Sequence, residues 1–197
     1  MLNGKKILLI IGGGIAAFKC HDLIRGLREA GASVIPVLTE AGKEFVTPLS
    51  ISVLSGSKVY SDLFDLEDET QMGHIELSRN SDLIVIVPAT ADLLAKMASG
   101  LANDLASTLL LATDTDVLAA PAMNVRMWEH LATRRNIQLL KKDGIGFIGP
   151  VEGSMACGEF GFGRMAEPEQ IIAAIKKKLS PGKLKGKHIV VTAGPTH

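Results

Sequence analysis

Three consecutive glycines at positions 12–14 lie between a short apolar run and a helical pattern. Glycine has no Cβ, so its backbone N–H groups can approach a phosphate closely, and a helix N-terminus adds unpaired donors and partial positive charge. The stretch Gly12–Ala17 also matches G-x-G-x-x-A, a dinucleotide-binding fingerprint that alone is a weak indication. A tight turn whose glycines serve only packing is the alternative. Because strand, turn and helix patterns agree, we favour phosphate binding.

The end of the second apolar run bears on which nucleotide this turn would hold. NAD requires an acidic residue there to bind the ribose, and the run ends in Leu38-Thr39-Glu40. Thr39 comes first, and a hydroxyl suits a phosphate better than a ribose diol. The order of residues therefore favours a mononucleotide, while Glu40 keeps NAD as an alternative.

Other side chains capable of chemistry stand in short motifs between apolar runs. They offer an imidazole, an amide, carboxylates and a thiol, the groups that orient substrates and transfer protons. The motifs are Gly73-His74-Ile75-Glu76-Leu77, Pro88-Ala89-Thr90-Ala91-Asp92, Gly100-Leu101-Ala102-Asn103-Asp104, Pro121-Ala122-Met123-Asn124-Val125-Arg126-Met127-Trp128 and Ala156-Cys157-Gly158.

Apolar runs alternate with helical periodicity along most of the chain. This order predicts a Rossmann-like α/β fold, a parallel sheet with helices on both faces, whose ligand-binding loops gather at the carboxyl edge of the strands. We expect strands over Lys6–Ile11, Ser33–Leu38, Asp82–Val87, Asp116–Ala120 and Gly146–Ile148. Helices are expected over Ile15–Ala30, Ala41–Leu54 with a break before Pro48, Ala91–Ser99, Leu105–Thr113, Met127–Lys142 and Glu167–Leu179.

Two stretches depart from this alternation. Gly153–Arg164 is rich in glycine and is interpreted as a mobile loop. Ser180–Lys187 is rich in Lys, Gly and Pro and predicts a linker, followed by a further strand over His188–Ala193. We therefore expect one domain over 1–179, a linker over 180–187 and the beginning of a second domain over 188–197 of a longer protein.

Composition excludes several classes of partner. The 197 residues include 21 basic and 21 acidic side chains, so no net charge draws the chain to nucleic acid or a membrane surface. No apolar run approaches the ~20 residues that span a bilayer. The two cysteines, Cys20 and Cys157, make no disulfide framework, which suggests a cytoplasmic protein, and no His/Cys cluster has the spacing of a metal site. Cys20 is expected to be buried and inert.

Taken together and in order, the motifs resemble those of the homo-oligomeric flavin-containing cysteine decarboxylases. The resemblance runs from about Lys5 to Met165, and Pro-x-Met-Asn-x-x-Met-Trp at 121–128 is its most specific part. It implies FMN as cofactor and the decarboxylation of phosphopantothenoylcysteine to phosphopantetheine, a carboxy-lyase reaction of coenzyme A biosynthesis. The ending Val190–Thr196 looks like the start of a fused synthetase domain. The family also implies trimers, with the flavin at a subunit contact, and assembly of these into dodecamers.

The resemblance assigns chemical roles to four residues. Members are understood to oxidise the cysteine thiol to a thioaldehyde through the flavin, to lose CO₂, and to reduce the resulting enethiol with the reduced flavin. His74 would accept the thiol proton or orient the substrate, although a lone histidine is more often a helix cap. Asn124 would hold the carboxylate without adding charge, and could also cap a helix; Met127 would shape the substrate pocket or simply pack. Cys157 would protonate the enethiol carbon as its loop closes.

The resemblance also assigns residues to FMN. These are Gly13, Gly14 and Ile15 at the phosphate turn, Thr39 and Ala41 after the second strand, Thr90, Ala91, Asp92 and Leu93 after the third, and Ala122 at the isoalloxazine edge. Asn103 and Asp104 are expected to organise the subunit contact. One departure concerns the turn itself, where many relatives have a serine and this chain has Gly12, so a donor to the phosphate would be lost.

Four other functions compete with this interpretation. A peptidyl-cysteine decarboxylase or a flavin prenyltransferase would use related folds, but the presence of both Asn124 and Cys157 disfavours the prenyltransferase. A non-catalytic FMN-binding regulatory subunit would not need Cys157. An NAD-dependent dehydrogenase would be colourless when purified.

Overall fold

The computed structural model describes residues 1–63, 73–156 and 158–180. Five parallel strands form one sheet in the order β2-β1-β3-β4-β5. The strands are β1 (Lys6–Ile11), β2 (Ser33–Leu38), β3 (Leu83–Ala89), β4 (Val117–Pro121) and β5 (Gly146–Phe147). This confirms the parallel Rossmann-like sheet predicted from the alternation of patterns.

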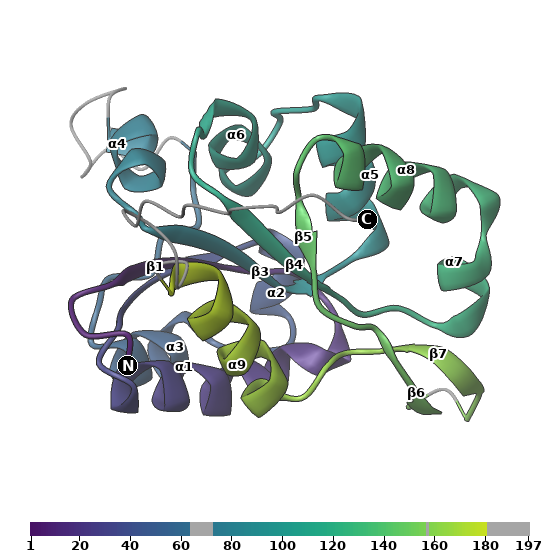
Figure 1. Ribbon diagram of the computed structural model, residues 1–197, viewed down its shortest axis with the longest axis horizontal. Coiled ribbons are helices and arrows are strands. Elements are labelled where there is room, and N and C mark those ends of the chain that lie inside the picture. Colours follow the sequence, from purple (N-terminus) through teal and green to yellow (C-terminus); the bar gives the residue numbers. More distant parts are fainter. Residues whose placement is uncertain (64–72, 157, 181–197) are drawn as a thin grey trace, which may run out of the picture.

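Helices cover both faces of the sheet, so the fold has three layers (Figure 1). On one face α1 (Cys20–Glu29) packs against both α3 (Pro48–Ser55) and α9 (Pro168–Leu179). On the other face α5 (Ala91–Ser99) packs against α6 (Leu105–Ala112) and α8 (Leu131–Lys142), and α6 packs against α4 (Gly73–Arg79). Every residue of the central strand β3 is buried, as its continuous apolar sequence predicts for a strand covered on both faces.

Two long helices of the sequence prediction are divided in the structure. The first begins as a 3₁₀-helix, η1 (Ile15–Lys19), and continues as α1. The helix expected over Met127–Lys142 is two helices, α7 (Val125–Glu129) and α8, because the backbone of His130 is extended there. The Nδ1 atom of His130 then accepts a hydrogen bond from the Ala132 amide and caps α8. The expected break before Pro48 separates α2 (Glu40–Lys43) from α3.

The segment expected to be a mobile loop is instead largely a β-hairpin. Its strands are β6 (Val151–Ser154) and β7 (Phe160–Arg164), which pair antiparallel. The glycines that indicated flexibility allow close packing: a Cβ at Gly163 would overlap the Met123 carbonyl oxygen, which is adjacent in the loop after β4. The Met123 amide also donates to the Gly163 carbonyl (3.0 Å), so the hairpin is bound to that loop.

The sheet order reverses direction between β1 and β3, the kind of switch point where parallel sheets bind ligands. The loops after these two strands pack on each other there. A Cβ at Gly12 would overlap the Pro88 carbonyl oxygen and come within 3.2 Å of the Thr90 side chain. The two loops therefore form one continuous floor at the carboxyl edge of the sheet.

Candidate functional site

A cavity of about 500 Å³ opens at this carboxyl edge. It lies between the turn after β1, the loops after β3 and β4, and the β6–β7 hairpin. The described residues that line it are Gly13, Gly14, Ile15, Ala16, Phe18, Lys19, Thr90, Ala91, Ala122, Met123, Asn124, Met127, Ser154, Met155, Ala156, Gly163, Arg164 and Met165. Eight of the residues predicted to form the site are in this set.

The glycine turn presents backbone to the cavity. Gly13 packs so closely on Ala41 that a Cβ there would overlap the Ala41 side chain. Gly14 is extended, with φ 178° and open space where a Cβ would stand, and no side chain caps η1 after it. The first N–H groups of η1 therefore lack a side-chain acceptor and border the cavity, as a phosphate site requires.

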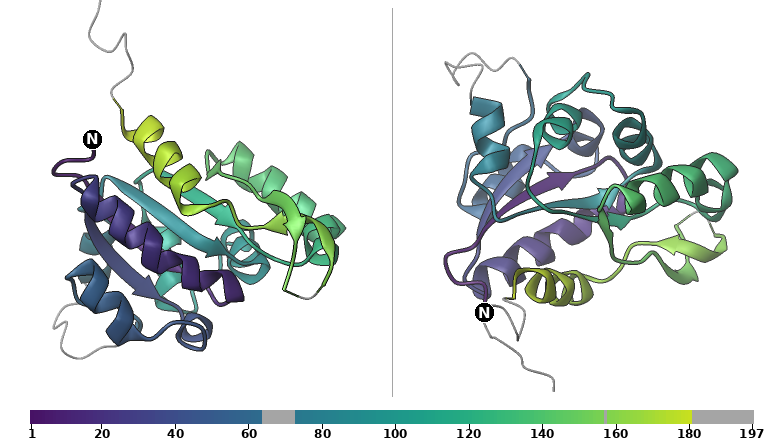
Figure 2. Two further views of the ribbon diagram at one scale, coloured as in Figure 1. Left: turned by 90° about the horizontal axis from the view of Figure 1, so that it is seen from below. Right: turned by 45° about the horizontal axis from the view of Figure 1, so that its top comes forward.

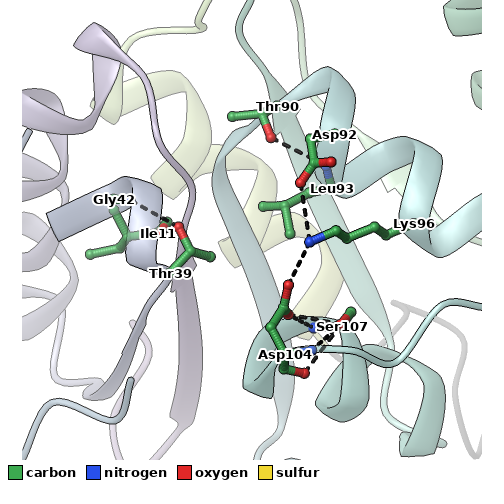
Figure 3. Close-up of polar contacts among 9 residues, drawn as sticks. All are labelled: Ile11, Thr39, Gly42, Thr90, Asp92, Leu93, Lys96, Asp104 and Ser107. Carbon is green, nitrogen blue, oxygen red and sulfur yellow. Dashed lines mark hydrogen bonds and ion pairs between the residues drawn. The ribbon is translucent and has the colours of Figure 1, made fainter. Parts of the chain in front are cut away.

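Thr39 and Ala41 lie beside this turn rather than on the cavity wall that the structure describes. The Thr39 hydroxyl donates to the Ile11 carbonyl (3.1 Å) and accepts from the Gly42 amide (3.0 Å), capping α2 (Figure 3). A hydroxyl has one proton to donate, and Thr39 uses it on the backbone of β1. In this conformation Thr39 positions the second strand's loop, and Ala41 supports Gly13 from below.

Of the four residues assigned to FMN after β3, two line the cavity and two do not. Thr90 and Ala91 line the cavity, and the Thr90 hydroxyl accepts from the Leu93 amide (3.2 Å), capping α5. Leu93 is buried in the core, with 3% of its surface exposed. Asp92 pairs with Lys96 (3.3 Å), which also contacts Asp104 at 2.6 Å (Figure 3).

Asn124 lines the cavity and also caps a helix. Its Oδ1 atom accepts a hydrogen bond from the Met127 amide (2.8 Å) at the start of α7. This fixes the side chain and leaves the Nδ2 donors without a partner among the described residues. The two roles weighed from the sequence, capping and substrate binding, are therefore geometrically compatible. Met127 also lines the cavity and is 44% exposed, so it is not a core residue in this chain.

Three charged residues near the cavity were missed by sequence reasoning. Lys19 and Arg164 line the cavity wall, and both pair with Glu167, which immediately precedes α9. Lys19 and Arg164 are 145 residues apart in the sequence, in η1 and β7, so no local motif connects them. The only sequence feature that places Lys19 near the site is its position within the first turns after the glycines.

Two of the predicted catalytic residues cannot be placed at the cavity from this structure. Cys157 lies outside the described residues, although its neighbour Ala156 lines the cavity. His74 is in the first turn of α4, and its side chain is likewise outside the described part of the chain. Figures 1 and 2 show α4 on the opposite side of the molecule from the β6–β7 hairpin, so the chain does not bring this helix to its own cavity.

The serine expected by analogy at position 12 does not fit this backbone, because its Cβ would overlap the Pro88 carbonyl oxygen. A glycine there lets the two loops meet. Cys20 is buried, as predicted, and its thiol contacts the Val87 carbonyl oxygen (3.0 Å). Burial raises the pKa of this thiol, which keeps it protonated and unreactive.

Within the described residues, no helix is long and apolar enough to cross a bilayer, and no group of three His, Cys, Asp or Glu side chains could hold a metal ion.

Comparison with known proteins gives consistent matches. The chain is 52% identical over 195 residues to the coenzyme A biosynthesis bifunctional protein CoaBC of Vibrio vulnificus strain YJ016, covering 99% of the chain and 49% of the relative. It is 48% identical over 196 residues to the CoaBC protein of Escherichia coli strain K12, covering 99% and 48%. The chain thus spans about half the length of the curated relatives it matches.

Solved structures agree with this result. A mutant PPC decarboxylase complexed with pantothenoylaminoethenethiol superposes with a TM-score of 0.81 at 33% identity, covering 88% of this chain and 97% of that one. The FMN binding protein AtHal3 superposes with a TM-score of 0.78 at 32% identity, covering 89% and 96%. The model of the family described as Flavoprotein matches residues 1–180. The chain therefore belongs to the Flavoprotein family.

Proposed function

We propose that this chain is an FMN-dependent decarboxylase that converts phosphopantothenoylcysteine to phosphopantetheine in coenzyme A biosynthesis. The observation that carries the proposal is the cavity that joins the glycine turn to Asn124 and Met127. The similarity to CoaBC proteins over 99% of the chain and to a PPC decarboxylase supports the same substrate. We further propose that residues 188–197, outside the described structure, begin a fused synthetase domain as in those bifunctional relatives.

The residues present fit a flavin mononucleotide. The uncapped first turn of η1 offers backbone donors to one phosphate, and open space adjoins Gly14 just before this turn. Ala91 and Ala122 are small residues on the cavity wall, where a flat ring could approach the backbone. When bound, FMN supplies the oxidation and reduction of the substrate that make loss of CO₂ feasible.

Asn124 is proposed to hold the substrate carboxylate. Its capping bond to the Met127 amide fixes the amide plane, and the remaining Nδ2 donors carry no charge. This neutrality matters because a cation at the same place would stabilise the ground-state carboxylate and oppose its loss. Met127, partly exposed beside it, is proposed to shape the pocket around the cysteine end of the substrate.

His74 and Cys157 are proposed as the residues that move protons in the two halves of the reaction. Because α4 lies on the opposite side of the molecule from the hairpin, His74 would reach a cavity only from a second copy of the chain. A homo-oligomer is therefore part of the proposal, and we take it to be the trimer that the family resemblance implies. Two apolar side chains at the cavity rim, Ile15 (62% exposed) and Phe18 (55% exposed), are the kind of surface that a second copy of the chain would cover.

The decisive experiment incubates the purified, flavin-loaded chain with phosphopantothenoylcysteine and follows phosphopantetheine by mass spectrometry. We expect a yellow protein and formation of product with release of CO₂. A flavin-loaded protein that forms no product would rule out the proposed activity, and a colourless protein that binds NAD would favour the dehydrogenase alternative.

A further inference from the structure

The cavity wall carries two positive charges that the proposed chemistry does not use. Of its described residues, only Lys19 and Arg164 are charged; the others are apolar, glycine, or the neutral polar residues Thr90, Asn124 and Ser154. The Lys19 side chain is only 14% exposed. A nearly buried ammonium is costly unless it is paired, so its position beside a cavity calls for an explanation.

A single carboxylate holds both cations in place. Lys19 Nζ lies 2.9 Å and 2.8 Å from the two carboxylate oxygens of Glu167, and Arg164 Nη2 lies 2.7 Å from one of them. Glu167 itself is not part of the lining, so it supports the two cations from outside the cavity. The three ionised groups together keep one net positive charge facing the cavity.

A glycine in β6 makes room for the Arg164 side chain to reach Glu167. Gly153 lies opposite Gly161 in the hairpin, and a Cβ at Gly153 would come within 3.2–3.3 Å of the Arg164 side chain. The glycine thus leaves room for the guanidinium to lie over β6 on its way to Glu167. The cations are held by elements from both ends of the sequence, η1 and the β7–α9 junction, which is the construction of a fixed site rather than of a mobile surface pair.

The proposed cofactor and substrate carry three anionic groups, and their chemistry indicates which of them Lys19 and Arg164 bind. The flavin phosphate has the N–H groups at the start of η1, whereas Lys19 is the last residue of that helix. At ~2 Å per residue for a 3₁₀-helix, the backbone of the first residue of η1 and that of Lys19 are about 8 Å apart. The cysteine carboxylate must leave as CO₂, so a cation beside it would slow the reaction. The one remaining anion of the proposed substrate is its phosphate monoester.

We propose that Lys19 and Arg164, held by Glu167, form a subsite for the phosphate monoester of the substrate. The proposal rests on the function proposed above and adds the group by which the substrate is selected. Guanidinium and ammonium groups together suit a doubly charged phosphate, through charge-assisted hydrogen bonds and simple charge. Lys19 and Arg164 are thus specificity-determining residues, and Glu167 is a positioning residue.

The test compares phosphopantothenoylcysteine with the same compound lacking its phosphate, pantothenoylcysteine. Both are assayed with the flavin-loaded wild type, Lys19→Gln and Arg164→Gln. Lys178→Gln is the matched control, because Lys178 also forms a partly buried ion pair, with Asp116 (3.3 Å), but does not line the cavity. Flavin content per chain and thermal unfolding are measured for every variant.

We expect the wild type to prefer the phosphorylated substrate. In Lys19→Gln and Arg164→Gln, kcat/KM for that substrate should fall about tenfold or more, as for loss of one charge-assisted hydrogen bond, mainly through KM. The value for pantothenoylcysteine should change little, so the preference collapses. Lys178→Gln should keep it. Inorganic phosphate should inhibit the wild type more strongly than the two cavity variants.

Two outcomes would overturn the subsite. An equal loss on both substrates would show that the cations serve the flavin or the fold, as would a parallel loss of bound flavin. A wild type that converts both substrates equally well would show that no phosphate is recognised. Failure of the proposed function is distinct from either outcome, because then the wild type would convert neither compound.

Discussion

The amide of Asn124 has two proposed roles, capping helix α7 and binding the substrate carboxylate, and each role uses a different atom. Its Oδ1 atom accepts from the Met127 amide, while the residue lines the cavity and its Nδ2 donors have no partner among the described residues. Substitutions can separate the two roles, because aspartate keeps the accepting oxygen and loses the donors. The sequence indicated both roles at this position, since capping residues are recognisable from local pattern alone.

Asn124→Asp is expected to keep the fold and lose the activity. Its carboxylate can still cap α7 but would repel the substrate carboxylate, so kcat/KM should fall by about 100-fold or more, a range typical of lost substrate positioning. Asn124→Ala should lose both activity and the cap, lowering the unfolding free energy by about 1 kcal/mol. Steady-state kinetics and denaturant unfolding separate the two effects.

The control for that pair is Thr47→Ala, which removes a cap of the same kind at α3, where Thr47 Oγ1 accepts from the Ser50 amide (3.1 Å). It should destabilise the chain by a similar amount and leave kcat/KM unchanged. An Asn124→Asp protein as active as the wild type would remove Asn124 from the substrate site.

The glycine turn gives a second residue-scale prediction, in which neighbouring positions behave oppositely. Gly12→Ser places a Cβ against the Pro88 carbonyl oxygen, so the loops after β1 and β3 must separate. We expect a lower melting temperature and less bound flavin per chain. Gly14→Ser enters open space with an extended backbone and should be tolerated, with flavin content at or above that of the wild type. Equal behaviour of the two variants in absorbance and thermal unfolding would contradict this packing.

At the scale of elements, local pattern predicted most of the parallel sheet but not the hairpin near the end of the domain. The five strands were expected close to their observed positions because buried parallel strands are continuous apolar runs. The β6–β7 hairpin was not, because its glycines suggest flexibility when read locally. The hydrogen bond that stabilises it, from the Met123 amide to the Gly163 carbonyl, joins segments 40 residues apart, and their close approach requires a glycine at position 163. The Lys19–Glu167–Arg164 group was missed for the same reason.

The ion pairs at Glu167 join η1, β7 and the start of α9, and they predict a pH dependence. The Lys19 ammonium, hydrogen-bonded to the carboxyl group, holds the pKa of Glu167 below its ordinary value of 4.5. The folded state therefore binds this proton less readily than the unfolded state. The stabilisation is fully present above pH 4.5 and is lost as the pH falls through the lower pKa of the folded protein.

Glu167→Gln removes this contribution at all pH values. The difference in melting temperature between wild type and variant should be constant near neutrality and shrink as the pH is lowered below 4.5. Glu169→Gln, on the same helix and without an ion pair among the described residues, should show no such trend. A Glu167→Gln difference that does not depend on pH would mean that the ion pairs add nothing to stability.

At the scale of the whole molecule, the distance of α4 from the cavity limits how His74 and Asn124 could belong to the same site. The order of motifs along the chain did not reveal it, because the resemblance assigned His74 a role at the site while its motif precedes the third strand, away from the loops expected at the carboxyl edge. Helix α4 instead precedes β3 and packs on α6, on the side of the sheet opposite the hairpin. We therefore propose that a second subunit completes the site that uses both residues.

Complementation tests this arrangement directly. His74→Asn and Asn124→Asp, each carrying a different tag, are produced together, and doubly tagged oligomers are isolated. If cavities form between subunits, some sites contain both intact residues, and part of the wild-type activity should return although each variant alone is inactive. Doubly tagged oligomers without activity would show that His74 and Asn124 belong to one chain's site, whereas full activity of His74→Asn on its own would show that His74 has no role.

The end of α9 has a practical consequence for any attachment to this protein. Lys178, in its last turn, pairs with Asp116 just before β4, so the helix finishes at the amino edge of the strands. The cavity opens at the other edge, and β1 begins near Met1 on the same side as the end of α9 (Figure 2). A tag, surface linker or fluorescent reporter joined after Ser180 would therefore leave from the side away from the cavity mouth. Immobilising the protein on a solid support through that end should leave the cavity accessible to small molecules in solution.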